Sequence, residues 1–283
     1  MKHLRKHALA IAVFAAVAVS FAIPLYRWST VPPAQETATT TPSRAQEFPE
    51  IATTTDPELY AYVEIIDSCG PYYQGTCVNL RSGPGTSYPV VMRLRNSIVL
   101  KVASEVTTTS GETWYRIDPG ADVRYPERIT TDWYVIASAV DPVYDPGDEV
   151  LEKGDTASTT KRIVIDLTKE MLYAYDGGTL FMQQAISTGL NLTPTPRGVF
   201  TVYKKTPSRY MQGPLPGISD QYYDLPGVPW DLYFTPDGAA IHGAYWHDHF
   251  GHPWSHGCVN LPPDKAHELY EWADLGTSVV VTN

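Results

Sequence analysis

The pattern of apolar and polar positions divides the chain into regions of different character. Residues 8–23 form an apolar run without a charged side chain, and Lys2, Arg5 and Lys6 precede it. A basic segment followed by such a run is typical of an export signal, and its length lies between that of a signal peptide and a full membrane span. We expect residues 1–28 to be a signal anchor, or else a cleaved signal peptide, that places the remainder outside the cytoplasmic membrane.

Residues 29–59 contain many Thr and Pro residues and show no apolar period. This composition cannot support a packed core and is typical of a disordered tether. We expect it to hold the folded part of the chain away from the membrane.

Residues 60–141 contain short runs of alternating apolar and polar residues, separated by turn-forming residues. The runs are Ala61–Ile66, Cys77–Arg81, Val90–Leu94, Ile98–Ala103, Thr113–Ile117 and Asp132–Ala137. Short strands at this spacing predict a small β-barrel or sandwich. Residues 142–160 are acidic and contain Pro and Gly, which predicts a linker.

Residues 161–283 also show mainly strand patterns. The predicted strands are Arg162–Leu167, Met171–Tyr175, Leu180–Ser187, Val199–Tyr203, Ala239–Gly243 and Thr277–Thr282. One helix is expected over 263–273, where apolar residues recur at helical spacing before Gly276. The fold class is therefore mainly β, with one or two short helices.

Residues 210–230 form a segment rich in Gly, Pro and Tyr, which is long for an irregular connection within a compact domain. We expect a lid or a substrate wall, with Tyr222, Tyr223 and Trp230 as its apolar side chains. The alternative is a loop that is packed permanently on the domain.

The charge balance restricts the possible partners. The chain has 21 Lys and Arg residues and 31 Asp and Glu residues, a formal charge of −10. The first 55 residues carry five basic and three acidic side chains, so the remainder carries 16 − 28 = −12. This excess argues against a nucleic-acid binder, which needs a basic face.

The candidate chemistry lies near the C-terminus, in Ile241-His242-Gly243 and Ser255-His256-Gly257-Cys258-Val259-Asn260. A nucleophilic cysteine needs a nearby base or positive group, and either histidine can supply one. The glycines allow close backbone approach, so that amides near Cys258 face a developing oxyanion. These residues predict a cysteine acyltransferase or protease.

The string Ser-His-Gly-Cys-Val-Asn with an upstream His resembles the signature of the L,D-transpeptidases, the YkuD family. The resemblance covers most of 161–283, including Thr-Pro-Arg-Gly-Val-Phe at 195–200. It implies a β-sandwich catalytic domain with Cys258 as nucleophile and His242 as base, oriented through the Gly243 carbonyl. His256 and Gly257 would shape the oxyanion site. We expect five residues to contact the substrate: Ser255, Asn260, Tyr233, Trp246 and Tyr223.

The earlier domain also carries a resemblance. Residues 79–88, NLRSGPGTSY, are similar to the signature of bacterial SH3-like domains, and Trp114 and Trp133 stand where that family places later strands. Such a module binds cell-wall material or acts as a spacer. Its tryptophans serve equally well as core.

The chain has three cysteines, which leaves one unpaired in an exported protein. A Cys69–Cys77 disulfide would free Cys258 for catalysis, and two reduced thiols are the alternative. The L,D-transpeptidase resemblance implies a peptidoglycan stem tetrapeptide as donor, a Cys258 thioester and a 3→3 crosslink. Water as acceptor would make the enzyme an L,D-carboxypeptidase, and a protein amine would make it a protein anchor.

Two other functions fit fewer features. His242, His247, His249, His252, His256 and Cys258 fall within 17 residues, and zinc prefers such ligands. A zinc-dependent wall peptidase is therefore an alternative, and a non-catalytic wall-binding protein is another. We favour the thiol enzyme, for which no metal and no cofactor is expected.

Overall fold

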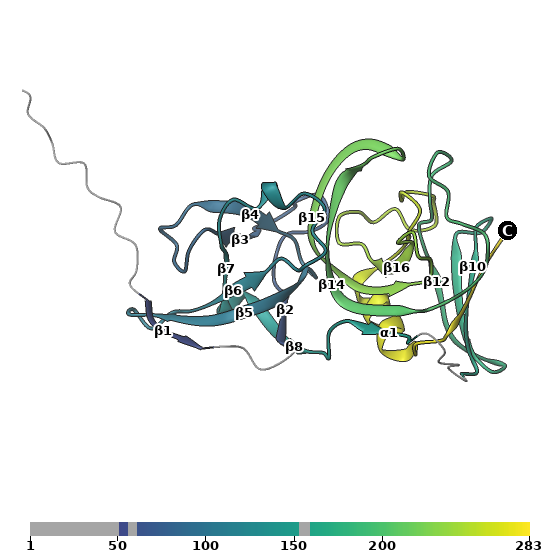
Figure 1. Ribbon diagram of the computed structural model, residues 1–283, viewed down its shortest axis with the longest axis horizontal. Coiled ribbons are helices and arrows are strands. Elements are labelled where there is room, and N and C mark those ends of the chain that lie inside the picture. Colours follow the sequence, from purple (N-terminus) through teal and green to yellow (C-terminus); the bar gives the residue numbers. More distant parts are fainter. Residues whose placement is uncertain (1–50, 56–60, 153–158) are drawn as a thin grey trace, which may run out of the picture. The chain divides into compact units, whose positions relative to one another are not determined.

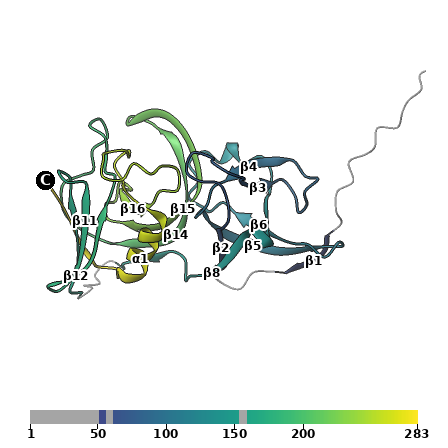
Figure 2. The ribbon, with the colours of Figure 1, turned by 180° about the vertical axis from the view of Figure 1, so that it is seen from behind.

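The computed structural model describes residues 51–55, 61–152 and 159–283, which all lie in the compact unit Gln46–Asn283. The described chain is mainly β, as predicted (Figures 1 and 2). The predicted anchor, residues 1–28, lies outside the described residues, as does most of the tether. Within the described part of the chain, no helix combines the length and apolarity that a membrane crossing requires.

The first sheet contains eight strands. They are β1 (Ile51–Thr55), β2 (Ala61–Ile65), β3 (Val78–Arg81), β4 (Val90–Leu94), β5 (Val99–Thr108), β6 (Thr113–Asp118), β7 (Trp133–Ile136) and β8 (Val140–Tyr144). Their order is β4-β3-β7-β6-β5-β2-β8, and β1 pairs with β5. Alternate residues of β5 are buried, as expected for a strand with one face on a core.

The structure shows strands within two segments that the sequence analysis predicted as tether and linker. Residues 51–55 of the predicted tether form β1. The predicted acidic linker is partly strand, because β8 pairs with β2 and β9 (Glu149–Val150) pairs with β14 (Lys204–Leu215). An acidic side chain of this segment forms an ion pair with the following domain: the Asp148 carboxylate lies 2.8 Å from Lys204 Nζ.

The second part contains two five-stranded sheets that share one core. The first sheet has the order β12-β11-β10-β18-β13 and the second β17-β16-β15-β14-β9. Their bounds are β10 (Lys161–Asp166), β11 (Met171–Asp176), β12 (Thr179–Ala185), β13 (Gly198–Thr201), β14 (Lys204–Leu215), β15 (Ser219–Tyr233), β16 (Ala240–Gly243), β17 (Val259–Leu261) and β18 (Ser278–Thr282). Ile163 and Val279 from the first sheet pack with Leu232 and Ile241 from the second. This arrangement is the predicted sandwich.

Helix α1 (Pro263–Trp272) is the predicted helix, one residue shorter than expected. It begins with Pro at its first position, where the missing amide hydrogen is not needed. Its buried residues Ala266, Leu269 and Tyr270 join the sandwich core, and it contacts β15 and β16.

The segment predicted as an irregular lid or wall is a long hairpin. Strands β14 and β15 pair from Lys204 with Tyr233 to Leu215 with Ser219, and the connection between them is only the turn 216–218. Trp230 is buried in the sandwich core and stacks on His267 with ring centroids 3.8 Å apart. It is therefore scaffold and not a wall of a site.

The hairpin also packs on the eight-stranded sheet of the first part of the chain. Tyr210 and Val228 belong to the same apolar cluster as Leu100 and Trp133, and Ser208 Oγ donates a hydrogen bond to Val99 O over 2.5 Å. A Cβ on Gly227 would lie 2.3 Å from that same carbonyl oxygen. Glycine at this position is thus required for the close approach of the two sheets.

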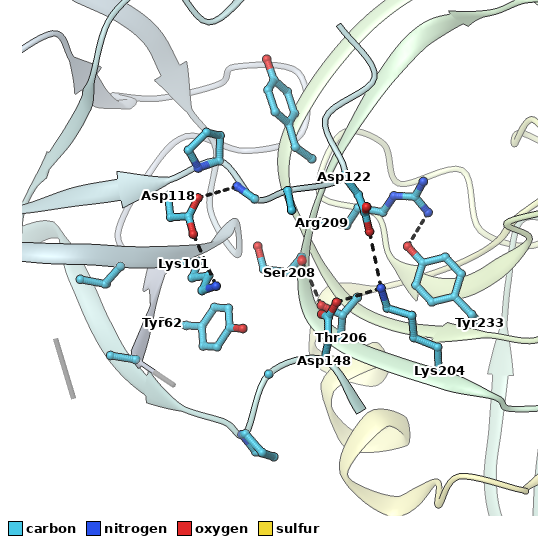
Figure 3. A pocket seen from close by; sticks show the side chains of 18 residues that line it. Tyr62, Lys101, Asp118, Asp122, Asp148, Lys204, Thr206, Ser208, Arg209 and Tyr233 are labelled. Carbon is cyan, nitrogen blue, oxygen red and sulfur yellow. Dashed lines mark hydrogen bonds and ion pairs between the residues drawn. The ribbon is translucent and has the colours of Figure 1, made fainter. Parts of the chain in front are cut away.

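A charged cavity of ≈ 580 Å³ lies along this junction (Figure 3). Lys204 Nζ lies 2.8 Å from Asp148 and 3.6 Å from Asp122, and Lys101 lies 3.4 Å from Asp118. The charges lining the cavity are therefore largely paired with each other.

Candidate active site

Adjacent parallel strands bring His242 close to the turn that carries Cys258. In the β16–β17 pair, His242 stands opposite Asn260, and Cys258 lies in the bend just before β17. Directly paired residues of neighbouring strands share a face of the sheet, so His242 and Asn260 point the same way. All three line a cavity of ≈ 1270 Å³. The upstream His and the Cys of the sequence motif are thus brought together.

His242 is held in one tautomer. Its side chain is 2% exposed, and its Nδ1 lies 3.0 Å from the Gly243 carbonyl oxygen. A carbonyl can only accept, so Nδ1 carries the hydrogen and Nε2 of the neutral ring is left as an acceptor. Burial lowers the pKa of His242 to about 4. The imidazole is therefore neutral at pH 7 and able to take a proton.

Gly243 supports this arrangement through its lack of a side chain. A Cβ there would lie 2.8 Å from the Pro229 ring and 3.1 Å from Pro263 Cα. These contacts are too close for any larger residue without movement of the backbone. The carbonyl that orients His242 is therefore fixed by packing on β15 and on the start of α1.

Cys258 is a free, partly exposed thiol. Burial raises its pKa; the nearby Asp231 also raises it, while Arg209 and the Ala240 backbone amide lower it. Since the thiol pKa is raised and the His242 pKa is lowered, both groups are neutral at rest. For this thiol to act as a nucleophile, its proton would have to pass to an acceptor such as the imidazole.

The turn that carries Cys258 is closed by Ser255. Ser255 Oγ donates to the Cys258 carbonyl oxygen over 2.5 Å and accepts from the Gly257 amide over 3.1 Å. Gly257 has φ +118°, which side-chain-bearing residues rarely adopt. The hydroxyl of Ser255 is thus engaged within the turn. Among the described residues the Cys258 amide has no acceptor, which leaves it available as an oxyanion donor.

A neighbouring loop holds this turn in place. The Ser255 amide donates to Thr188 O over 2.9 Å, and Thr188 in turn donates its amide and hydroxyl to the buried Glu170 carboxylate over 2.7 and 2.6 Å. Thr193 and Pro194 follow in the same loop and line the cavity. This loop therefore lies beside the Cys258 turn, where Thr193 Oγ1 also donates to Ser255 O over 3.4 Å.

The remaining histidines have different surroundings. His247 is buried, its Nε2 lies 2.9 Å from Asn260 Nδ2, and its Nδ1 accepts from the His249 amide over 3.2 Å. His256 is partly exposed and stacks on Tyr223 with ring centroids 5.7 Å apart. Within the described residues, no cluster of three or more His, Cys, Asp or Glu side chains suits a metal ion.

The predicted substrate contacts divide into two groups. Ser255, Asn260, Trp246 and Tyr223 line the Cys258 cavity. Tyr233 is absent from that lining: it is 5% exposed, accepts a hydrogen bond from Arg209 and faces the charged cavity of Figure 3. The expectation that Tyr233 contacts substrate is therefore not supported by its position, because its ring belongs to the packed junction.

Two residues near Cys258 were missed by the sequence analysis. Arg209 lines both cavities, and Asp231 is fully buried, with neither carboxyl oxygen hydrogen-bonded in the described structure. Burial raises the pKa of Asp231 well above its usual value, and Arg209 opposes that rise. Both residues lie in the β14–β15 hairpin, which the sequence pattern had not identified as strand.

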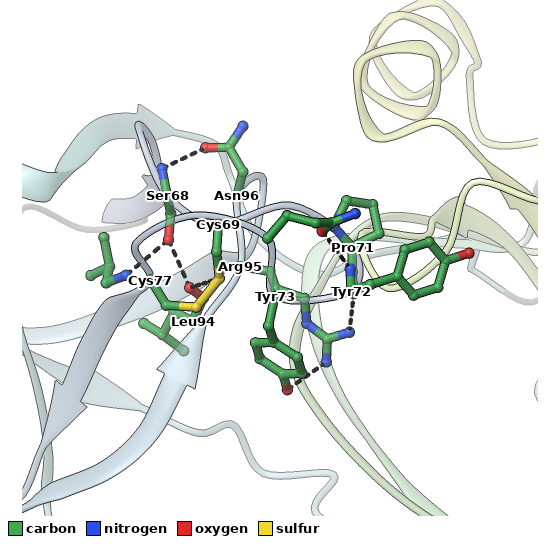
Figure 4. Close-up of a disulfide and its surroundings, with 11 residues drawn as sticks. Ser68, Cys69, Pro71, Tyr72, Tyr73, Cys77, Leu94, Arg95 and Asn96 are labelled. Atoms are coloured by element: carbon green, nitrogen blue, oxygen red, sulfur yellow. Dashed lines mark hydrogen bonds between the residues drawn. A yellow bond between two sulfur atoms is a disulfide. The ribbon is translucent and has the colours of Figure 1, made fainter.

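The other two cysteines form a disulfide. Cys69 and Cys77 are bonded (Figure 4), and this leaves Cys258 as the free thiol of the described chain. The loop that the disulfide closes contacts the connection between β16 and β17, where Tyr72 OH donates to the Asp248 carboxylate over 2.8 Å.

Comparison with known families supports both resemblances. Residues 160–281 match the family model of the L,D-transpeptidase catalytic domain (YkuD), and residues 77–126 match that of the bacterial SH3 domain. These matches confirm the two resemblances found in the sequence. A sequence comparison with curated proteins gave no match.

Several solved structures are similar to part of the chain. A mutant of the L,D-transpeptidase of Enterococcus faecium is 29% identical over 44% of this chain and 50% of that chain, with a TM-score of 0.40. The catalytic domain from E. faecium, solved by NMR, is 28% identical over 44% of this chain and 99% of that domain, with a TM-score of 0.39. An L,D-transpeptidase from Mycobacterium smegmatis is 18% identical over 84% of this chain and 100% of that one, with a TM-score of 0.42. The matched part spans about half of the first of these chains.

Proposed function

Taking residues 160–281 as an L,D-transpeptidase catalytic domain, we propose that this protein forms 3→3 crosslinks in peptidoglycan through a thioester on Cys258. The carrying observation is that His242, fixed through Nδ1 to the Gly243 carbonyl, lines the same cavity as Cys258. This geometry leaves Nε2 as the proton acceptor for the thiol.

The acyl-enzyme forms through a tetrahedral intermediate. Cys258 Sγ attacks the carbonyl of the third residue of a stem tetrapeptide, the carbon–sulfur bond forms, and the thiol proton passes to His242 Nε2. When the intermediate collapses, the bond to the terminal D-Ala nitrogen breaks and His242 gives the proton to that nitrogen. The free amide of Cys258 supports the transient oxyanion.

The second step transfers the acyl group. The side-chain amine of the third residue of another stem attacks the thioester carbonyl and gives a proton to His242. The carbon–sulfur bond then breaks, and His242 passes the proton to the Cys258 sulfur, which regenerates the thiol. If water attacks instead, the product is a tripeptide and the enzyme acts as an L,D-carboxypeptidase. The cavity of ≈ 1270 Å³ exceeds the usual size of a small-molecule site and accommodates peptides.

The proposed location is the outer side of the cytoplasmic membrane. It is supported by the basic residues that precede the apolar run at 8–23 and by the Cys69–Cys77 disulfide, which persists in oxidising compartments. The stem peptides of the wall are accessible there.

The proposal is tested by incubating purified wall with the full chain and digesting it to fragments for mass spectrometry. We expect 3→3 linked dimers with the wild type and none with Cys258→Ala. Tripeptides without dimers would favour the carboxypeptidase. An unchanged wall with a folded wild-type protein would refute both activities.

A further inference from the structure

The SH3-like region contributes to the cavity that holds Cys258. Arg95, Asp122, Val123 and Arg124 line it together with the catalytic residues. The last three lie in the β6–β7 loop, residues 119–132. The catalytic cavity is therefore built from both regions of the chain.

The β6–β7 loop is bound firmly to the hairpin. The Tyr125 amide donates to Gln212 Oε1 over 2.8 Å, and Tyr125 OH donates to Pro214 O over 2.8 Å. Arg128 lies 3.9 Å from the Asp224 carboxylate and places its guanidinium 4.5 Å from the Tyr222 ring centroid. These contacts lie directly after Arg124, so they fix the position of its backbone at the cavity wall.

Of the three arginines that line this cavity, Arg95, Arg124 and Arg209, Arg124 is the one available to bind a ligand. Arg95 already donates to Pro71 O and to Tyr73 OH, both over 3.1 Å (Figure 4), and Arg209 donates to Tyr233. Arg124 is exposed and has neither an ion pair nor a hydrogen bond within the described part of the chain. Its charge acts on Tyr223, which stacks on His256 beside the nucleophile.

We propose that Arg124 binds a free carboxylate of the donor stem peptide, so that the SH3-like region forms part of the substrate-binding site. The inference rests on the proposed function for the identity of the peptide. A guanidinium binds a carboxylate through two parallel hydrogen bonds. The surroundings of Arg124 favour an anionic ligand, because the neighbouring Asp122 carboxylate is paired with Lys204, whose Nζ lies 3.6 Å away, and not with Arg124.

The test separates binding from catalysis. The full chain carrying Cys258→Ala is titrated calorimetrically with a stem tetrapeptide bearing free carboxylates and with the same peptide fully amidated. Adding Arg124→Ala should weaken the affinity for the free-acid peptide about fivefold, as expected for an exposed ion pair. The affinity for the amidated peptide should not change. Arg124→Lys should retain most of the affinity. In the active enzyme, Arg124→Ala should raise KM and leave kcat unchanged.

Arg93→Ala is the matched control, since Arg93 is an exposed arginine of the same region that does not line the cavity. Equal weakening of both peptides by Arg124→Ala, or no weakening of either, would overturn the inference. A wild type that releases no D-Ala, together with carboxylate-dependent binding through Arg124, would refute the proposed function and leave the recognition intact.

Discussion

Ser255 and Cys258 are joined by a short hydrogen bond: the Ser255 hydroxyl donates to the Cys258 carbonyl oxygen over 2.5 Å. The same oxygen of Ser255 accepts from the Gly257 amide. The hydroxyl of Ser255 therefore holds the backbone that carries Cys258 through two hydrogen bonds within the turn.

The first prediction follows from this bond. Ser255→Ala should lower kcat for D-Ala release about 100-fold, because small displacements of a nucleophile have effects of this size. Ser255→Thr retains the hydroxyl and should restore most of the rate. Circular dichroism should show that both variants are folded. A wild-type rate in folded Ser255→Ala would show that the turn does not need the hydroxyl.

The second prediction concerns the protonation state of the thiol. Because burial raises the pKa of Cys258, alkylation by iodoacetamide should have its midpoint above about 8.5, the value for an ordinary cysteine. Rates are to be measured by intact mass between pH 6 and 10, taken as roughly the range that brackets this pKa. A midpoint near neutrality would indicate a resting thiolate–imidazolium pair instead.

The third prediction links His242 to stability. Its pKa is lowered from 6.5 to about 4 by burial, so between these values the unfolded chain binds a proton that the folded chain does not. The free energy of unfolding should therefore fall as pH decreases from 6.5 to about 4, by about 3 kcal/mol for this group. His242→Gln should flatten that part of the urea-denaturation profile. His247, whose pKa is also lowered to about 4, should show the same behaviour, so the double variant is the informative control.

The fourth prediction concerns Asp231, which is buried without a hydrogen-bond partner among the described residues. Its pKa is raised by burial, so the folded state favours the protonated acid, and the contribution of this group to stability falls as pH rises above its unfolded value. Asp231→Asn should be more stable than the wild type at pH 8, and this gain should vanish near pH 4. Urea midpoints at the two pH values measure it. A loss of stability at pH 8 would mean that the charge is compensated by Arg209.

The sequence pattern predicted those parts of the fold whose apolar residues alternate plainly, such as β10 and β11, and the helix α1, whose start and end are marked by Pro263 and Gly276. It failed for the β14–β15 hairpin. The strand pattern there is interrupted by four prolines, Pro207, Pro214, Pro226 and Pro229. Tertiary packing on the eight-stranded sheet overrides this local signal.

The residues of the candidate site also divide into those that a local sequence signal marks and those that it does not. Cys258 and His242 were predicted as site residues because their neighbours form a recognisable string, and the structure places both at one cavity. Arg124 and Asp231 carry no local signal, since their positions depend on how the SH3-like region and the hairpin pack. The misplacement of Tyr233 has the same cause, because its ring packs against Arg209 and lines the charged cavity instead of the Cys258 cavity.

The most direct test of the account is the mass of the acyl-enzyme. Wild-type protein and Cys258→Ala are mixed with a stem tetrapeptide, quenched in acid within seconds and measured intact. The account predicts a wild-type adduct equal in mass to the tetrapeptide less D-Ala, lost on treatment with hydroxylamine and absent from Cys258→Ala. Release of D-Ala by Cys258→Ala at the wild-type rate, or an adduct on another residue, would contradict the assignment of Cys258 as the nucleophile.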